Sequence, residues 1–265
     1  FAIVASAKDM AKIKAELLST FDSRDLGPAS YFLGLSIERD RQARTLLLHQ
    51  ERYITDIAET YGVSDTKPKS TPLLGARLTK EGTPLDNAGK TKYMGIIGSL
   101  LYASLCTRPD IAYATGALAR YSAAPTEQHM RLALGVLQYL YTTKTNGIKY
   151  SSNGSLKLQA WCDADYGGDM DTRRSTTGFV ATLGSGAVLW GSRLQKTVAA
   201  STAEAEYIAA SHCTRDMLWL RTLLGELGVN AGTIDIKTDN QAALAIIKNP
   251  VLSMRSKHID IAYHF

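Results

Sequence analysis

Cysteine is scarce in this sequence, and the three cysteines that occur are widely separated. Cys106, Cys162 and Cys213 form no Cys-x-x-Cys pair, which argues against a zinc site and favours a reduced, intracellular protein. Long apolar runs are also lacking, because none reaches the roughly 20 residues that a membrane-spanning helix needs. The sequence therefore predicts neither a zinc site nor a membrane partner.

The last part of the chain has no net charge. From Lys157 to Phe265 there are 11 basic and 11 acidic residues, whereas the first 156 residues carry 19 basic and 14 acidic residues and hence the whole net charge of +5. An initiator methionine and a signal peptide are missing too, since the chain begins inside the apolar run FAIVAS and stops at IAYHF. We expect two domains cut from a longer polypeptide, and the basic excess fits a nucleic-acid partner without demanding one.

Strand and helix patterns alternate in the first 155 residues. We predict a buried strand at 1–6, a helix at 8–22, a hairpin at 30–50 and a helix at 51–63 that Gly62 closes. Residues 64–92 hold three of the seven prolines and are predicted to be a linker. The pattern from Tyr93 to Tyr141 is helical, with breaks at Pro109 and Pro125. We interpret the polar stretch 143–155, with its two Asn-Gly turns, as a domain boundary.

The last third predicts a mixed sheet. Three strand patterns at 156–164, 176–183 and 187–194 indicate an antiparallel meander. A long helix, a fourth strand at 233–239 and a second helix that Pro250 stops follow in that order. A strand, a helix and a strand in succession favour a crossover that makes the fourth strand parallel to its neighbour. Ligand chemistry in such a sheet lies at the carboxyl ends of the strands.

Two aspartates stand where these strands end. Asp163 ends the first strand of the meander and Asp239 ends the fourth, so their carboxylates converge if the two strands are parallel neighbours. The helix between them contains two glutamates with different tasks. Ser201 and Glu204 fit a capping box, whereas Glu206 heads the apolar stripe of the helix and is expected to face the sheet.

A buried carboxylate without a partner is costly, and a cation would remove that cost. Three acids from two strand ends and one helix make a hard-oxygen site suited to magnesium or manganese. The alternative is structural, because aspartate next to glycine or asparagine at a strand end is common turn chemistry. Asp165, Asp169 and Asp171 are interpreted in that way, as turn or surface acids. Glu206 on an apolar stripe is the residue that the structural alternative explains least.

The order of these motifs resembles the RNase H domain of copia-type retrotransposon Pol polyproteins. The matching stretches are WCDADYGGDMDTRRSTTGFV, LWGSRLQKTVAASTAEAEYIAAS, TDNQAALAIIKNP and RSKHIDIAYHF, and they leave hardly a gap from Leu158 to the end. The stretches DLGPASYFLGLSIERD, TLLLHQERYITDIA and GSLLYASLCTRPDIAYA are similar to the end of that family's reverse transcriptase. The family's Tyr-x-Asp-Asp polymerase turn is absent, so we expect the polymerase part to be inert here.

The resemblance implies an α+β chain with three regions. Residues 1–72 would be the C-terminal part of the reverse transcriptase palm with a hairpin like a primer grip, and 73–155 a linker and a helical thumb or connection region. Residues 156–265 would be an RNase H-like domain, whose five-stranded type of mixed sheet is flanked by helices and lacks its last strand. The implied activity is hydrolysis of the RNA strand of RNA–DNA hybrids during reverse transcription.

The resemblance also implies ligands. Two Mg²⁺ ions, or Mn²⁺, would be bound by Asp163, Glu206 and Asp239, with Asp163 between the two ions. Such enzymes use a fourth acid, for which Asp260 is the late candidate, although Asp260 could instead hold Lys257 or His258 on a helix.

Nucleic-acid contacts are implied for both parts of the chain. Phosphates would be bound by Arg173, Arg174, Arg193 and Lys196, and the primer end by the hairpin around Phe32 and Gly34. For each of these basic residues, plain solvated surface is the alternative. The remaining implied partners are the primer–template and the other Pol and Gag segments of a parent polyprotein, in a cytoplasmic virus-like particle or in the nucleus.

A second hypothesis belongs to a different class of function. The chain could be a catalytically inactive remnant that acts only as a nucleic-acid-binding or structural module. The intact set of three acids favours descent from the enzyme.

Overall fold

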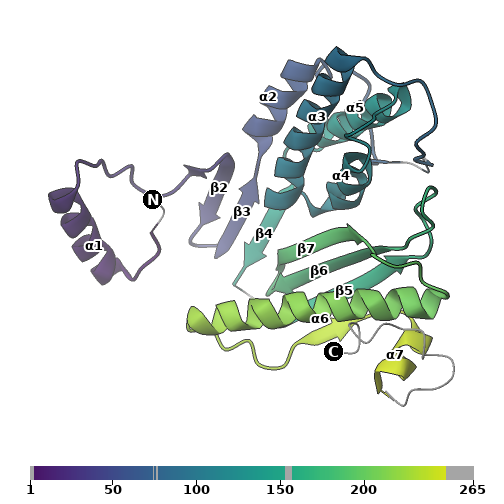
Figure 1. The fold of residues 1–265 in the computed structure, drawn as a ribbon. Helices are drawn as coiled ribbons and strands as arrows, with labels where there is room; N and C mark the ends of the chain where they lie inside the picture. The colour runs from purple at the N-terminus through teal and green to yellow at the C-terminus, as the bar shows by residue number, and fades with distance from the viewer. Residues whose placement is uncertain (1–2, 74, 76, 153–156, 249–265) are drawn as a thin grey trace.

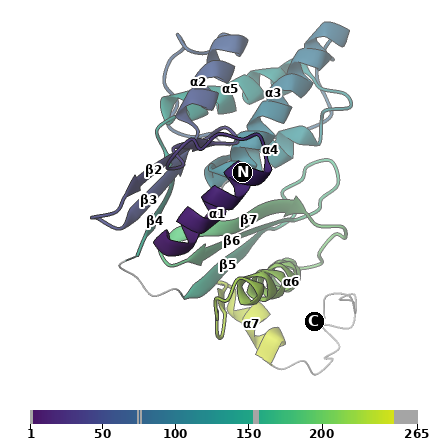
Figure 2. The ribbon, with the colours of Figure 1, turned by 90° about the vertical axis from the view of Figure 1, so that its left-hand side faces the viewer.

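A computed structural model of the chain describes residues 3–73, 75, 77–152 and 157–248 (Figure 1). These residues form two four-stranded sheets, seven α-helices and one short 3-10 helix. Figure 2 shows the second sheet between a helical region above it and the long helix α6 (Thr202–Glu226) below it. No helix in the described part of the chain is both long and apolar enough to cross a membrane.

The first sheet has the order β1-β2-β3-β4 and is antiparallel throughout. Its strands are β1 (Tyr31–Phe32), β2 (Leu35–Asp40), β3 (Thr45–His49) and β4 (Gly147–Ser151). The hairpin predicted at 30–50 is confirmed. The stretch 143–155, predicted to contain turns, includes a strand that was not predicted: Ile148 is buried, and the backbone of β4 pairs with β3 from Gly147↔His49 to Ser151↔Thr45.

The start of the chain also differs from the expectation. The buried strand predicted at 1–6 is wrong for the described residues, since Ile3 to Ser6 join no strand and Val4 is 97% exposed. An apolar run becomes a strand only where a neighbour completes its hydrogen bonds, and no described strand pairs with this run. The helix predicted next is confirmed as α1 (Ala7–Thr20), which stands clear of both sheets in Figure 1.

The helical region forms the core of the first part of the chain. Its elements are α2 (Glu51–Tyr61), α3 (Asn87–Cys106), the 3-10 helix η1 (Pro109–Ile111), α4 (Ala112–Ala119) and α5 (Glu127–Thr142). Gly62 ends α2 in the left-handed conformation (φ 72°), and the breaks predicted at Pro109 and Pro125 separate α3, α4 and α5. The side chains of Ile54, Tyr93, Leu100, Leu137 and Leu140, among others, are fully buried between these helices.

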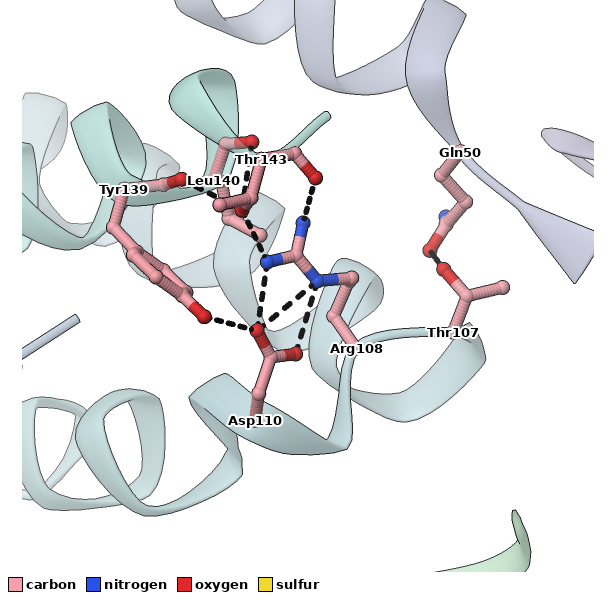
Figure 3. Close-up of polar contacts among 7 residues, drawn as sticks. All are labelled: Gln50, Thr107, Arg108, Asp110, Tyr139, Leu140 and Thr143. Atoms are coloured by element: carbon pink, nitrogen blue, oxygen red, sulfur yellow. Dashed lines mark hydrogen bonds and ion pairs between the residues drawn. The ribbon is translucent and has the colours of Figure 1, made fainter. Parts of the chain in front are cut away.

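A buried arginine ties the ends of these helices together (Figure 3). Arg108 is 1% exposed, and its guanidinium group donates to both carboxylate oxygens of Asp110 at 2.7–3.3 Å. The same group donates to the carbonyl of Thr143 at 3.0 Å and to its hydroxyl at 2.6 Å, just past the end of α5. Tyr139 of α5 donates to Asp110 at 2.8 Å. The network therefore fixes the link between α3 and α4 against the end of α5.

The second sheet has the order β7-β6-β5-β8. Its strands are β5 (Leu158–Asp165), β6 (Thr176–Leu183), β7 (Gly186–Leu194) and β8 (Asp235–Lys237), and α7 (Gln241–Lys248) follows. The predicted meander and the predicted parallel pair are both confirmed, because β5–β6–β7 are antiparallel and β5 pairs with β8 in parallel. Apolar side chains of β5 and α6 share the second core, among them Leu158, Cys162, Cys213 and Met217.

The second sheet meets both the first sheet and the helical region directly. Tyr150 of β4 donates to the carbonyl of Ala187 at 2.6 Å, and the indole N–H of Trp190 donates to the carbonyl of Ser104 at 2.7 Å. Two acids interpreted as turn or surface residues lie in this contact. Asp169 is 6% exposed with its carboxylate 3.4 Å from Arg120, and Asp171 accepts the Tyr121 hydroxyl at 3.0 Å. The loop between β5 and β6 therefore anchors one part of the chain to the other.

Candidate metal centre

Three carboxylates converge at one end of the second sheet. Asp163 comes from β5, Glu206 from the first turns of α6, and Asp239 from the second position after β8. One oxygen atom of each residue lies within 4.8 Å of the others. In the described part of the chain, this is the one group of three or more acidic, histidine or cysteine side chains that is placed to hold a metal ion.

The local sequence explains why these side chains meet. Along β5 the small or apolar side chains of Leu158, Ala160 and Cys162 are buried, and the alternation leaves Asp163 exposed beside them. Asp239 follows β8 at the same end of the sheet, because β8 runs parallel to β5. Glu206 is only 6% exposed and lies on the buried face of α6, as the apolar stripe predicts.

Glu206 is the residue of the three with a raised pKa and a buried oxygen atom that has no hydrogen-bond partner. Burial, followed by the negative charges of Asp163 and Asp239, raises the pKa of the Glu206 carboxyl group to about 7. The backbone N–H of Ala164 opposes this shift. The buried Oε2 atom of Glu206 has no hydrogen-bond partner. A divalent cation would satisfy this atom and neutralise the repulsion, so the three residues fit a Mg²⁺ or Mn²⁺ ion.

Glu204, two residues earlier, has the structural task that the sequence predicts. The hydroxyl of Ser201 accepts the N–H of Glu204 at 3.1 Å and caps α6. The Glu204 carboxylate accepts the N–H of Ala200 at 2.8 Å, so it folds back over the start of its own helix. The two glutamates are both buried, and what separates them is the group that each one faces.

Glu204→Gln should lower the free energy of unfolding by about 1 kcal/mol, because it weakens the charge-assisted bond that holds the helix start. Urea denaturation of both chains measures this change. The metal affinity should stay within twofold of the original chain. A Glu204→Gln chain that has lost metal affinity would show that the tasks of Glu204 and Glu206 are assigned the wrong way round.

The structure separates the other predicted site residues into three places. Arg173 and Arg174 lie in the loop that anchors to the helical region, and Arg173 adopts a positive φ of 57°. Arg193 and Lys196 lie at and just beyond the end of β7. Phe32 ends β1 and Gly34 lies in the turn between β1 and β2, far along the chain from the three acids. Asp260 lies outside the described residues.

A groove beside Asp163 was not predicted from the sequence. It has a volume of about 410 Å³ and lies between η1, α4 and the strands β5, β6 and β7. Tyr113, Trp161 and Trp190 contribute aromatic surface to it, and Asp163 and Asp165 contribute carboxylates. Tyr113 and Trp161 are 44% and 38% exposed. The sequence shows these aromatic residues only as single large side chains in a helix and two strands, so their convergence could not be foreseen.

Comparison with known proteins places the chain among transposon proteins. It is 41% identical over 262 residues to the "Retrovirus-related Pol polyprotein from transposon TNT 1-94" of Nicotiana tabacum, covering 97% of this chain and 20% of that protein. It is 38% identical over 252 residues to the Pol polyprotein from transposon RE1 of Arabidopsis thaliana, covering 94% of this chain and 17% of that protein. It is 34% identical over 213 residues to the putative transposon Ty5-1 protein of Saccharomyces cerevisiae, covering 80% of this chain and 69% of that protein.

These similarities define a class of protein, the retrovirus-related Pol polyproteins of transposable elements. The chain belongs to the Pol polyproteins of copia-type retrotransposons, as its motifs predict. It spans about a fifth of the length of the plant Pol polyproteins that it matches. No protein-family model and no solved structure matches it.

Proposed function

We propose that this chain carries the RNase H activity of its polyprotein and hydrolyses the RNA strand of RNA–DNA hybrids. The observation that supports the proposal most is the convergence of Asp163, Glu206 and Asp239 from β5, α6 and the end of β8. The order of the strands, β7-β6-β5-β8 with β5 and β8 parallel, agrees with the meander and the parallel pair that the strand patterns predict, and it supports the proposal because it brings the ends of β5 and β8 together.

The donor set supports magnesium or manganese as the cofactor, because both ions prefer carboxylate oxygens. Two bound ions would supply an activated water and would stabilise the 3′-oxygen that leaves the phosphodiester. The chain itself holds three carboxyl groups in place. Asp163 is fixed by the ladder between β5 and β6, opposite Gly178, and Glu206 is fixed by burial on α6. Asp260 stays a candidate for the fourth acid.

The first part of the chain is assigned to duplex binding. Its whole net charge of +5 supports attraction to a phosphate backbone. The turn between β1 and β2 is held in place, because the Tyr102 hydroxyl donates to the carbonyl of Leu33. Gly34 has a φ of 72°, which favours glycine, and a Cβ there would lie 2.9 Å from the Tyr102 oxygen, so a larger residue would displace the Tyr102 side chain. This rigid turn supports the assignment of Phe32 and Gly34 to the primer end.

A strand-specific cleavage assay tests the proposal. The chain is incubated with Mg²⁺ and a hybrid whose RNA and DNA strands carry different labels, and we expect cleavage of the RNA strand alone. Asp239→Asn should abolish cleavage. Asp235→Asn is the matched control, because Asp235 lies at the start of β8, has a side chain that is 42% exposed and pairs with Lys157 away from the three acids, and it should cleave normally.

Two outcomes would contradict the proposal. Cleavage that survives in Asp239→Asn would show that the three carboxylates do not carry the chemistry. A chain that binds the hybrid but leaves the RNA intact, in Mg²⁺ and in Mn²⁺, would instead support the nucleic-acid-binding module.

A further inference from the structure

A buried glutamine lies between the start of α6 and the second sheet. Gln195, directly after β7, is 1% exposed, and its backbone N–H donates to the carbonyl of Ser175 at 2.8 Å. Its side-chain amide donates to the carbonyl of Ala205 on α6 at 2.9 Å and to the hydroxyl of Thr177 on β6 at 3.1 Å. Gln195 is thus fixed to the sheet by its backbone, and its side chain joins the sheet to the helix.

The bond to Ala205 acts on the backbone that carries the buried carboxylate. The carbonyl of Ala205 and the Cα atom of Glu206 belong to one planar peptide unit. A donor that holds this carbonyl in place therefore also holds the point from which the Glu206 side chain extends. The hydrogen bonds within α6 fix Glu206 relative to its own helix, whereas this bond from outside the helix fixes it relative to the sheet.

The bond to Thr177 leads to the other side of the metal centre. Thr177 pairs with Ala164 across the ladder between β6 and β5, and Ala164 follows Asp163 directly. Gln195 therefore links the peptide unit before Glu206 to the strand pair that carries Asp163. Because the two carboxylates come from different elements, the distance between them depends on links of this kind.

Such a link is needed because the carboxylates of the metal-free site repel one another. One oxygen atom each of Asp163, Glu206 and Asp239 lies within 4.8 Å of the others, and like charges at such distances repel. The repulsion acts to move the start of α6 away from β5. An arginine or lysine could also hold the helix, but its charge would neutralise the carboxylates that a metal ion needs. The Gln195 amide holds the helix and leaves the charge of the site unchanged.

We propose that Gln195 is a positioning residue that sets the separation of Glu206 and Asp163 for the binding of a divalent cation. The inference rests on the proposed function and deepens it, because it assigns the shaping of the cation site to a residue outside the three acids. Gln195 acts through the backbone of Glu206. Its buried Oε1 atom has no hydrogen-bond partner, which is a cost that a leucine would not have. What the amide provides at this position is its two N–H bonds.

The affinity for Mn²⁺, measured together with stability, tests this role. Gln195→Leu removes both side-chain bonds at nearly constant size. It should weaken Mn²⁺ binding by about tenfold, the lower end of the range for residues that support metal ligands. Calorimetric titration of the whole chain measures the affinity, and urea denaturation in a chelator measures the stability.

Gln50→Leu is the matched control. Gln50 is also fully buried, and its amide oxygen accepts the Thr107 hydroxyl at 2.8 Å in the helical region (Figure 3). Its loss should lower stability as the loss of Gln195 does, because each substitution removes buried hydrogen bonds. The Mn²⁺ affinity of Gln50→Leu should nevertheless stay within twofold of the original chain.

Thr177→Val is a milder second variant, which keeps the role testable if Gln195→Leu does not fold. Thr177 is 1% exposed, and the substitution removes one acceptor of the Gln195 amide while the bond to Ala205 remains. It should weaken Mn²⁺ binding by about threefold, the effect of one hydrogen bond.

The comparison separates a positioning role from a purely structural one. Equal Mn²⁺ affinities of Gln195→Leu and Gln50→Leu would overturn the positioning role, and so would an unchanged affinity of Thr177→Val. The original chain is assayed in parallel for Mn²⁺ binding and for RNA cleavage. If it binds Mn²⁺ and the variants follow the expected order of affinities, but the RNA stays intact, the proposed hydrolysis alone is refuted. An original chain without affinity for Mn²⁺ refutes the proposed function and the positioning role together.

Discussion

Glu206→Gln should abolish Mg²⁺-dependent cleavage of the hybrid and should also make the metal-free chain more stable at pH 8. The loss of cleavage follows because the amide offers a metal ion no negative charge. The gain in stability follows because the substitution removes a carboxylate that is buried beside Asp163 and Asp239 with one oxygen unpaired. The Glu206 side chain would thus be required for cleavage although it lowers the stability of the metal-free fold.

The pH dependence of this effect has a definite sign. The pKa of Glu206 is raised from 4.5 to about 7 in the folded chain, so the folded state binds more protons than the unfolded state between these values. Stability from this group is complete below pH 4.5 and is lost as the pH rises through 7. The advantage of Glu206→Gln over the original chain should therefore be larger at pH 8 than at pH 5, by about 2 kcal/mol.

Urea denaturation at both pH values, in the presence of a chelator, measures this difference. Glu204→Gln is the matched control, since it makes the same substitution two residues away on the same helix and should keep cleavage. A Glu206→Gln chain that still cleaves the hybrid, or that is destabilised equally at pH 5 and pH 8, would contradict the assignment of Glu206 as the buried metal ligand.

Arg108→Ala should lower the free energy of unfolding by about 2–3 kcal/mol, because it removes the charge-assisted hydrogen bonds of a buried guanidinium group, whereas its partner Asp110 remains 36% exposed to water. The substitution would leave Asp110 facing Tyr139 without its cation and would leave the Thr143 carbonyl without a donor. It would also open a cavity between α3, α4 and α5. The substitution should also destabilise the second sheet, because α4 packs against β7.

Arg131→Ala is the control, since Arg131 is an exposed residue of α5 and its loss should change stability by less than about 0.5 kcal/mol. The pair also predicts a pH effect. Burial alone would raise the pKa of the Asp110 carboxyl group, but the Arg108 guanidinium group holds this pKa below its usual value. The ion pair therefore stabilises the fold at pH values above the usual pKa of aspartate. This stabilisation is lost as the pH falls through the lowered pKa. Equal stability of Arg108→Ala and Arg131→Ala in urea at pH 7 would show that the network is dispensable.

The sequence could predict the three acids because their placement depends on local rules. The alternation of β5 sets Asp163 at a strand end, the apolar stripe of α6 turns Glu206 inward, and the crossover through α6 brings β8 beside β5. Each of these steps follows from the hydrophobic pattern or the order of the elements, which the sequence shows directly. The capping role of Glu204 was accessible for the same reason, since it involves residues within four positions of one another.

The features that the sequence could not predict depend on partners far along the chain. β4 forms because β3 offers it an edge, although a polar stretch with two turns suggested a boundary. Asp169 and Asp171 look like loop acids until Arg120 and Tyr121 of the helical region lie against them. The apolar run at the start of the chain predicted a strand by its composition alone, but no described strand pairs with it.

The location of a bound metal ion tests the central claim most directly. Crystals of the chain soaked in Mn²⁺ would reveal the ion by its anomalous scattering, with Asp163→Asn crystals as the control. We expect anomalous density enclosed by the carboxylates of Asp163, Glu206 and Asp239, and none at that position in the control. Density at another site, or an empty triad at millimolar Mn²⁺, would contradict the assignment of these three residues as the metal centre.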